Sequence, residues 1–210
     1  QLSGSIAHEL RNPLAAMESS SYYLSRVLKD PDEKVKKHLA IIHERVMFSN
    51  NLITNLLDLT RARSLTLVKR DVNSAIKDVL ADFKEKEGIV IKTQLNEGLP
   101  VIELDLIRIL SVFQNILSNS VQSMPEGGSL DIKTRIKDGF INVEFKDTGV
   151  GISNENIQKI FEPLFTTKSR GIGLGLSLVK TIIDDHKGQI SVESEIDKGT
   201  TFTVKLPTIK

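Results

Sequence analysis

The chain has 210 residues, 40% hydrophobic and 26% charged, so it can bury one core of ordinary size together with a smaller element. Its 28 Lys and Arg residues nearly balance 27 Asp and Glu residues, which gives no bulk electrostatic case for binding nucleic acid. The absence of cysteine excludes disulfides and thiolate metal sites, and no apolar run has the length of a membrane span. Because Gln1 lies within what already reads as a helix, we expect the chain to be a fragment of a longer protein.

Residues 1–64 read as two long amphipathic helices. Pro31 interrupts the pattern between them, so the helices should fold into an antiparallel hairpin. Two helices cannot bury both apolar seams alone, and we therefore expect a homodimer whose two hairpins form a four-helix bundle. The seam positions recur every three or four residues: Leu10, Leu14, Met17, Ser21, Leu24 and Leu28, then Val35, Leu39, Ile42, Val46, Ser49, Ile53 and Leu56.

A histidine and an acid are adjacent in the first of these helices, within Ser5-Ile-Ala-His-Glu-Leu-Arg-Asn-Pro-Leu14. A neutral imidazole acts as a nucleophile when a carboxylate keeps its other nitrogen protonated, and Glu9 could orient His8 in this way. Taken alone, the pair is explained better as an ordinary surface histidine. Pro13 is expected to bend the helix just beyond His8, a kink that is useful for motion but equally common without a role.

From Leu65 onward, strands and helices alternate, which predicts an α+β sandwich with helices on one sheet face. The border between the two domains should fall near residues 63–68. The turn signals Asp138-Gly139 and Asp197-Lys198-Gly199 predict two hairpins. The expected strands are 89–95, 129–136, 140–146, 189–195 and 200–206, and the expected helices are 105–122 and 173–186.

Two polar motifs of this second part suit a nucleotide. Asn115 and Asn119 are four residues apart, so both amides project from one helix face, where a side-chain carbonyl can ligate magnesium. Asp147 ends a predicted strand and can accept a hydrogen bond from an exocyclic amine, while Gly149 and Gly151 allow close backbone approach to a flat or anionic ligand. Each motif also has a plain structural explanation, since buried amides and glycine turns are common in cores and loops.

A second glycine-rich motif, Gly171-Ile-Gly-Leu-Gly-Leu176, opens a helix after a loop that carries Lys168 and Arg170. Backbone amides and the helix dipole attract phosphate at such a place. No Gly-Lys-Ser/Thr sequence occurs, and the first glycine motif does not open a dinucleotide-binding helix. The chain therefore carries neither a Walker nor a Rossmann site.

In their order along the chain, the motifs resemble those of the sensor histidine kinases of two-component signalling. The resemblance covers essentially the whole chain and implies a dimerisation and histidine-phosphotransfer hairpin at 1–64 and a catalytic ATP-binding domain at 65–210, of the gyrase, Hsp90 and MutL (GHKL) type. Met124-Pro-Glu-Gly-Gly and a short lid resemble the nitrogen-regulator-sensor subtype. The motifs are His8-Glu-Leu-Arg-Asn-Pro, Asn115 with Asn119, Asp147-Thr-Gly-Val-Gly-Ile, Phe161-Glu-Pro-Leu-Phe, Gly171-Ile-Gly-Leu-Gly-Leu and Gly199-Thr-Thr-Phe-Thr.

The resemblance implies the reaction and its partners. His8 would be autophosphorylated from ATP with Glu9 as its orienting base, and the group would pass to an aspartate of a response-regulator receiver domain. Asn12 would position a water molecule when the phosphorylated partner is dephosphorylated. A sensor domain would lie upstream, and the present chain would be a cytoplasmic portion of a soluble or membrane-anchored protein.

The resemblance also assigns the nucleotide site. Asn119 would ligate Mg²⁺, Asp147 would hold the adenine amine, and Lys168 would reach the terminal phosphate of ATP. Asn115 would support the phosphate or water network. The other nucleotide-binding positions it implies are Gly149 and Gly151 at the adenine wall, Phe161 and Phe165 as lid anchors, Gly171, Gly173 and Gly175 beneath the phosphates, and Leu174 and Thr200 in the same motifs.

The chain departs from the family pattern at a few positions. Ser120 and Ser123 replace alanines that are often found there, Gln122 stands where many members carry lysine, and Ile172 replaces the threonine usual in the subtype. Two other functions stay open, an ATP-driven clamp of the chaperone or gyrase kind and an inactive nucleotide-binding scaffold. The clamp enzymes carry a hydrolytic glutamate where this chain has Asn115.

Overall fold

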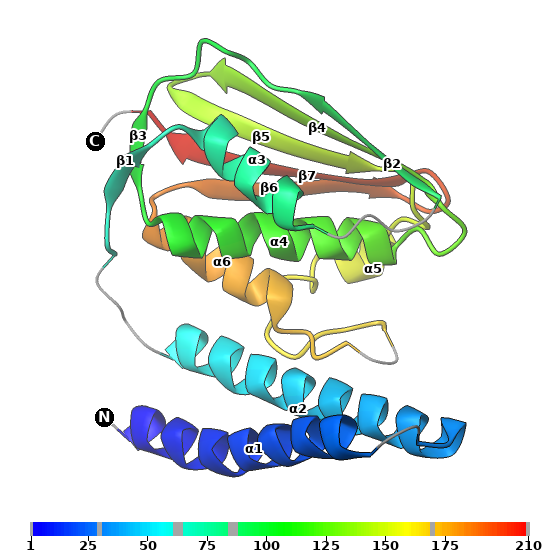
Figure 1. The fold of residues 1–210 in the computed structure, drawn as a ribbon. Helices are drawn as coiled ribbons and strands as arrows, with labels where there is room; N and C mark the ends of the chain where they lie inside the picture. Colours follow the sequence, from blue (N-terminus) through cyan, green and yellow to red (C-terminus); the bar gives the residue numbers. More distant parts are fainter. Residues whose placement is uncertain (1, 29–30, 61–64, 84–87, 169–170, 209–210) are drawn as a thin grey trace. The chain divides into compact units, whose positions relative to one another are not determined.

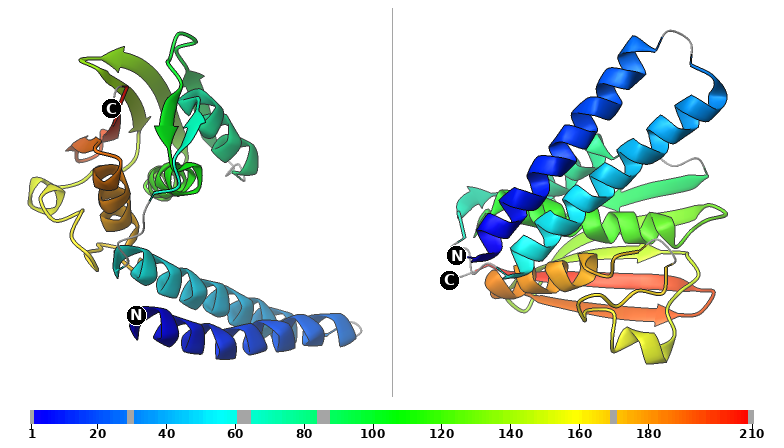
Figure 2. Two further views of the ribbon diagram at one scale, coloured as in Figure 1. Left: turned by 90° about the vertical axis from the view of Figure 1, so that its left-hand side faces the viewer. Right: turned by 90° about the horizontal axis from the view of Figure 1, so that it is seen from below.

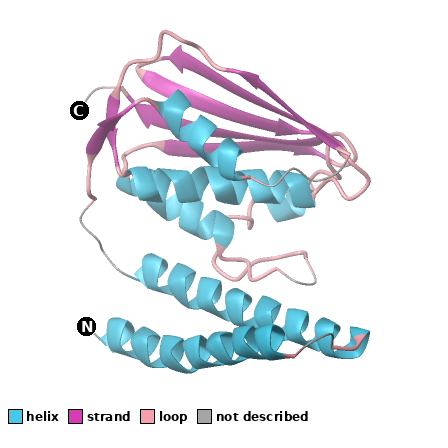
Figure 3. Ribbon diagram, in the orientation of Figure 1, coloured by secondary structure: helices cyan, strands magenta, loops and turns pink. Residues whose placement is uncertain are grey.

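The computed structural model describes residues 2–28, 31–60, 65–83, 88–168 and 171–208. Side chains at 2–9 and at several other helical positions are outside this description. The chain divides into two compact units, Gln1–Ala62 and Arg63–Lys210, and each is described by itself. Figure 3 shows that the first unit is helical and that the second combines helices with strands. None of the helices in the described ranges combines the length and apolar character needed to cross a membrane.

The first unit is the predicted antiparallel hairpin of α1 (Leu2–Val27) and α2 (Glu33–Thr60), shown in Figure 1. α2 begins where Asp32 Oδ1 accepts a hydrogen bond from the Val35 N–H at 2.8 Å, which supplies the oxygen that a helix N-terminus needs. α1 is assigned as one helix through Pro13. Val46 and Ile53 are buried, and Leu14 packs against Ile53.

The predicted seams of the hairpin are only partly buried by the hairpin itself. Ser21 and Val46 are buried, whereas five apolar seam residues keep 40–53% of their surface exposed. Ile53 is buried as well, Leu14, Val35, Leu39 and Ser49 are half-buried, and the side chain of Leu56 lies outside the described set. The expected four-helix bundle requires a second copy of the chain, so the dimer stays a prediction. The five exposed seam residues are Leu10, Met17, Leu24, Leu28 and Ile42.

The second unit is built on a five-stranded sheet in the order β2-β4-β5-β7-β6. β2 pairs with β4 in parallel, and the other neighbours are antiparallel. A small separate sheet joins β1 (Val68–Arg70) to β3 (Ile102–Leu104). The strands of the large sheet are β2 (Ile89–Gln94), β4 (Gly128–Lys137), β5 (Phe140–Asp147), β6 (Gln189–Glu195) and β7 (Gly199–Pro207).

Helices cover one face of this sheet, and Figure 2 shows α4 and α6 beside each other on that face. Aspartates cap two of the helices: Asp71 accepts from the N–H groups of the first turn of α3, and Asp105 does so for α4. Phe113 of α4 packs on Phe145 of β5 with ring centroids 5.7 Å apart, which joins the helix layer to the sheet. The helices are α3 (Val72–Asp82), α4 (Leu106–Gln122), α5 (Asn154–Ile157) and α6 (Gly175–Asp185).

Both predicted hairpins are present. The turn of the first hairpin lies at Asp138 and Gly139, whose φ angles of 53° and 76° are tolerated by an Asp-Gly pair. The predicted start of the last helix was wrong by two residues. α6 begins at Gly175 because Gly173 has φ of 72°, which a right-handed helix cannot contain. Four short elements, β1, α3, β3 and α5, were not predicted from the sequence.

Candidate functional site

Asp147 ends β5 on the face of the sheet that carries the helices. Ile141, Val143 and Phe145 alternate along this strand as buried residues, so Asp147 continues the inward series and is 1% exposed. Its Oδ1 accepts hydrogen bonds from the N–H groups of Gly149 and Thr200, both at 3.0 Å. A carboxylate held in this way has a fixed orientation, and a buried carboxylate is rare without such partners.

The chain packs closely around this carboxylate. A Cβ atom on Gly149 would overlap the side chain of Ser123, the residue that follows α4, and one on Gly199 would overlap the Asp147 carbonyl. The buried Thr200 side chain shares a hydrogen bond with Ser194, with 2.9 Å between the hydroxyl oxygens. Gly151 has φ of 71° and abuts the backbone of residue 195. Both predicted adenine-wall glycines therefore stand where a side chain would not fit.

The two predicted asparagines lie on α4, four residues apart and half-buried. Asn115 Nδ2 donates to the Ser111 carbonyl at 2.8 Å, which orients its amide along the helix. A Cβ on Gly175 would lie 2.7 Å from Asn115 Oδ1, so the first residue of α6 approaches the amide closely. This contact brings the second glycine motif to the helix that carries Asn119.

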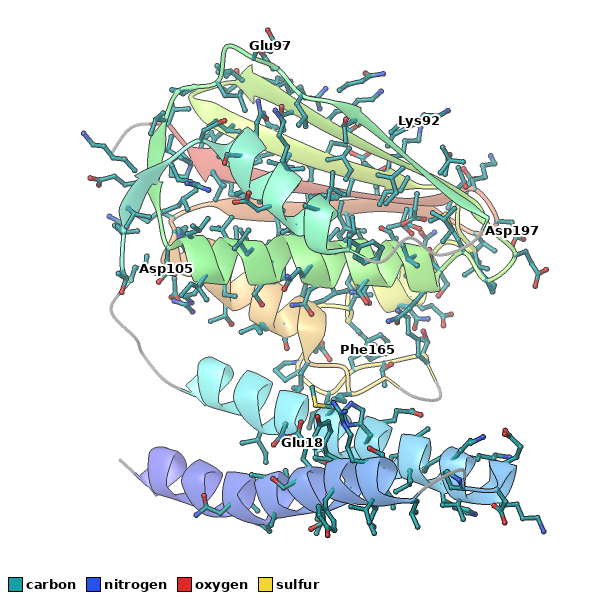
Figure 4. All side chains as sticks on the ribbon, in the orientation of Figure 1. Glu18, Lys92, Glu97, Asp105, Phe165 and Asp197 are labelled. Atoms are coloured by element: carbon teal, nitrogen blue, oxygen red, sulfur yellow. The ribbon has the colours of Figure 1, made fainter. Side chains whose placement is uncertain are left out.

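The loop before α6 is held by a backbone hydrogen bond from the Leu164 N–H to the Gly173 carbonyl at 2.9 Å. Phe161 and Phe165 are half-buried, and Figure 4 labels Phe165 on this loop. Leu174 is buried as the residue before α6. A Cβ on Gly173 would lie 2.5 Å from the Phe165 carbonyl oxygen, so this turn accommodates glycine only.

Lys168 reaches from this loop to α4. Its Nζ lies 2.9 Å from Asn119 Oδ1 and 2.8 Å from Gln122 Oε1. Loss of hydration around the ammonium ion lowers the pKa of Lys168 from its usual range, and the negative charge of Asp147 opposes this shift. The Asn119 carbonyl thus already accepts hydrogen bonds from a cation. An amide oxygen of this kind also fits Mg²⁺, which prefers oxygen ligands.

The second unit therefore brings together the predicted nucleotide-binding residues in two groups, one at the end of β5 and one between α4 and the loop before α6. His8, Glu9 and Asn12 belong to the first unit, on α1. Asn12 is exposed, and the side chains of His8 and Glu9 lie outside the described set.

The hairpin also contains a hollow that none of the predicted site residues lines. It encloses about 740 Å³ between the two helices, beside Glu18, Tyr22, Leu39 and His43. Glu18 and three serines of α1 line it together with apolar residues such as Leu39, so its wall is partly polar and partly apolar.

Three residues near the site, Gln122, Ser118 and Ser194, were not predicted as site residues from the sequence. Gln122 was noted only as a departure from the family pattern, although it lies one helical turn beyond Asn119 and faces the same side of α4. Ser118 accepts from Gln122 Nε2 at 3.0 Å. The helical spacing was the available signal for Gln122, whereas the contact of Ser194 with Thr200 depends on strand register.

Comparison with known proteins identifies both units. Residues 104–210 match the family described as histidine kinase-, DNA gyrase B-, and HSP90-like ATPase, and residues 1–65 match the His Kinase A (phospho-acceptor) domain. The chain is 28% identical to sporulation kinase E of Bacillus subtilis strain 168 and 31% identical to sensor histidine kinase ZraS of Escherichia coli K12. The alignments cover 99% and 98% of this chain, but only 28% and 45% of those proteins.

A solved structure agrees with these matches. The crystal structure of histidine kinase ThkA in complex with response regulator protein TrrA superposes with a TM-score of 0.71 at 28% identity. The superposition covers 99% of this chain and 61% of the solved one. A phospho-acceptor hairpin followed by an ATPase domain is the arrangement expected from the sequence motifs. The chain belongs to the sensor histidine kinases.

Proposed function

We propose that this chain transfers the γ-phosphoryl group of ATP to His8 and then to an aspartate on a response-regulator receiver domain. The observation that carries the proposal is the buried Asp147 carboxylate, held by two backbone N–H groups in an ATP-binding family domain. An adenine amine placed opposite this carboxylate would make a charge-assisted hydrogen bond. The homologous ThkA was crystallised with a response regulator, which supports a receiver domain as the partner.

Different residues of the second unit bind different parts of the nucleotide. Asp147 selects the purine, and Gly149 and Gly151 leave room for its flat face. Asn119 offers a carbonyl oxygen to Mg²⁺, which when bound neutralises charge on the phosphate oxygens. Lys168 and the N–H groups that open α6 stabilise the terminal phosphate, because phosphoryl transfer depends mainly on positioning and charge.

The phosphoacceptor belongs to the first unit. The unprotonated nitrogen of His8 attacks the γ-phosphorus in line, the bond to the leaving oxygen of ADP breaks, and the ring then releases the proton on its other nitrogen. Glu9 accepts a hydrogen bond from the ring and keeps the nucleophilic nitrogen unprotonated. Transfer requires the two domains to approach each other. We assign 1–64 to the phosphotransfer domain and 65–210 to the catalytic domain.

We also propose that two copies of the hairpin form a four-helix bundle. The exposed seam residues described above give the hairpin an apolar stripe that one chain cannot cover, and a second copy presents the same stripe. The match of residues 1–65 to the His Kinase A domain supports this arrangement.

Labelling with ATP that carries radioactive γ-phosphate tests the main proposal. We expect acid-labile, base-stable label on the protein, and no label on His8→Gln. His38→Gln, an exposed histidine of α2, is the matched control and should label normally. Release of free phosphate without labelled protein would indicate the ATP-driven clamp, and neither signal would indicate the scaffold. Label retained by His8→Gln would contradict His8 as the acceptor.

We further propose that the same helix dephosphorylates the phosphorylated partner. Asn12 lies four residues after His8, so a helix returns it to the same face, while Glu9 stands about 100° away. An amide can orient a water molecule but lacks the basicity to activate an imidazole. Asn12→Ala should retain autophosphorylation and lose phosphatase activity, whereas Glu9→Ala should mainly lose autophosphorylation. Equal loss of both activities in Asn12→Ala would contradict this division.

A further inference from the structure

The contact between Lys168 and α4 joins segments that are 46 and 49 residues apart in the chain. Its two acceptors, Asn119 Oδ1 and Gln122 Oε1, lie one helical turn apart. The Gln122 amide is itself oriented, because Gln122 Nε2 donates to Ser118 Oγ at 3.0 Å. Its carbonyl oxygen is thereby turned toward the ammonium ion and its amino group away from it.

The backbone of Lys168 is held as well. The Lys168 N–H donates to Thr166 Oγ1 at 3.1 Å, and the Lys168 carbonyl accepts from the Gly171 N–H at 3.1 Å. A Cβ on Gly171 would overlap Thr166 Oγ1, so Gly171 lies closely against the Thr166 side chain. The loop therefore presents the lysine at a defined point, and the contact is constrained from both sides.

We infer that Gln122 is a positioning residue. When the Asn119 carbonyl binds a divalent cation and no longer accepts from Lys168, Gln122 still holds the Lys168 ammonium ion at the phosphate end of the nucleotide site. The inference rests on the proposed function, which assigns Asn119 to the metal and Lys168 to the terminal phosphate. Gln122 itself contacts neither substrate nor metal.

Electrostatics explains why a second acceptor is needed. Two cations on one amide oxygen repel strongly at hydrogen-bonding distance, so the ammonium ion and a divalent cation cannot both stay on Asn119. Without Gln122, a lysine displaced from Asn119 regains its rotamer freedom and its hydration, and both must be lost again at each turnover. With Gln122, the same lysine keeps one carbonyl and stays within reach of a phosphate oxygen.

The first test removes the carbonyl and keeps the approximate size of the side chain. Gln122→Leu should lower the single-turnover autophosphorylation rate at saturating Mg²⁺-ATP by about tenfold, the loss expected for one hydrogen bond to a charged group. Affinity for ADP should change little, since ADP lacks the phosphate that Lys168 meets. Gln114→Leu, an exposed glutamine on the same helix, is the matched control.

The second test exchanges the two side chains. Gln122→Lys combined with Lys168→Gln places the ammonium ion on α4 and the amide on the loop, at the same contact. The double variant should autophosphorylate faster than Lys168→Gln alone. An equal rate for the double and single variants would overturn the inference, because an ammonium ion at this contact would then not contribute to the rate.

A third readout needs no nucleotide. In the nucleotide-free chain of 210 residues, Lys168→Met should shift the side-chain amide ¹⁵N–¹H resonances of both Asn119 and Gln122. Lys159→Met, an exposed lysine nine residues earlier, should leave these resonances in place. Unshifted amide resonances in Lys168→Met would show that the contact is not formed in solution, and the inference would fall.

These tests separate the inference from the function on which it rests. If the wild-type chain carries no label after incubation with ATP, the proposed function fails, whereas the resonance shifts can still report the contact. If the wild-type chain and Gln122→Leu label equally fast while Lys168→Gln is slow, the function stands and the positioning role of Gln122 is refuted.

Discussion

The helical hairpin and the ATPase unit use amphipathic helices in different ways. In the ATPase unit, α4 packs against a sheet and against two other helices, and its apolar residues Val112, Phe113 and Ile116 are at most 1% exposed. Within the hairpin, α1 and α2 pack on each other, and seam residues such as Met17 and Leu24 keep about half of their surface. The same helical periodicity therefore yields a closed core in one unit and an open apolar stripe in the other.

This difference fits the function proposed for each unit. A nucleotide site requires donors and acceptors held in fixed positions, and the closed core supplies them by fixing α4, β5 and α6 against one another. A phosphoacceptor helix has to meet a catalytic domain and then a receiver domain, which requires surface. We therefore expect the ATPase unit to fold stably by itself and the stability of the hairpin to depend on a second copy of the chain.

The largest effect should come from the core of the ATPase unit. Phe113→Ala removes a ring that is 1% exposed and stacks on Phe145, and it should lower the free energy of unfolding by about 3 to 5 kcal/mol. Denaturant titration should show this loss at every protein concentration. Ile107→Ala on the same helix is the control, since Ile107 is 81% exposed and its truncation should have little effect. A concentration-dependent loss would break the comparison.

The next effect concerns the site that the closed core holds. Asp147→Asn keeps an oxygen for the Gly149 and Thr200 N–H groups but presents N–H instead of oxygen to an adenine amine. ATP affinity should fall by about 1.5 to 3 kcal/mol, and far more than GTP affinity, because guanine has a carbonyl at that position. Calorimetry measures both, with Asp131→Asn on the neighbouring strand β4 as the control. Unchanged ATP affinity would refute the role of Asp147.

A smaller effect is expected in the hairpin. Leu24→Gln should weaken the dimer by roughly 1 kcal/mol for each copy, since only the still exposed part of the side chain is buried there. Sedimentation equilibrium should show a higher dissociation constant, while unfolding of the ATPase unit stays unchanged. The control is Lys37→Gln, an exposed charged residue of α2. A variant that remains as dimeric as the wild type would remove Leu24 from the interface.

The last effect is a dependence on pH. Burial lowers the pKa of His186, and the nearby positive charge of Arg108 acts in the same direction. The Ile182 carbonyl bond and the charges of Asp105 and Asp185 oppose the shift. As the pH falls, the unfolded chain protonates this histidine before the folded chain does. The contribution of neutral His186 to the free energy of unfolding is therefore complete above about pH 6.5 and is lost as the pH falls below that value.

His186→Gln tests this dependence. His186 Nε2 accepts the Asp105 N–H at 2.9 Å, which a neutral ring can do and a glutamine carbonyl can replace without titrating. The free energy of unfolding should therefore fall less steeply between pH 7 and 5 in the variant than in the wild type. Identical slopes would show that His186 is not held neutral by the fold.

Local chemistry explains what could be predicted from the sequence. The break at Pro31, the turn at Asp138-Gly139 and the strand-ending Asp147 depend on residues close in the chain, and these features appear where they were expected. The order of the motifs was also sufficient to identify the family. By contrast, β1 and β3 are three residues each, too short to carry a periodic signal, and they form by pairing with each other from distant parts of the chain. α3 does carry a helical signal, because Val72, Ala75, Ile76 and Val79 follow the capping Asp71 at helical spacing, and the prediction overlooked it.

The contacts between distant motifs were decided by tertiary structure. The sequence alone determined that Asn119 and Lys168 are polar residues suited to a phosphate site, and that Gln122 follows Asn119 by one helical turn. It could not determine that the Lys168 ammonium ion donates to both Asn119 and Gln122. That contact depends on how the loop before α6 folds onto α4, more than 40 residues earlier in the chain. Side-chain chemistry is set by residue type, but the meeting of side chains from remote segments is set by the packing between them.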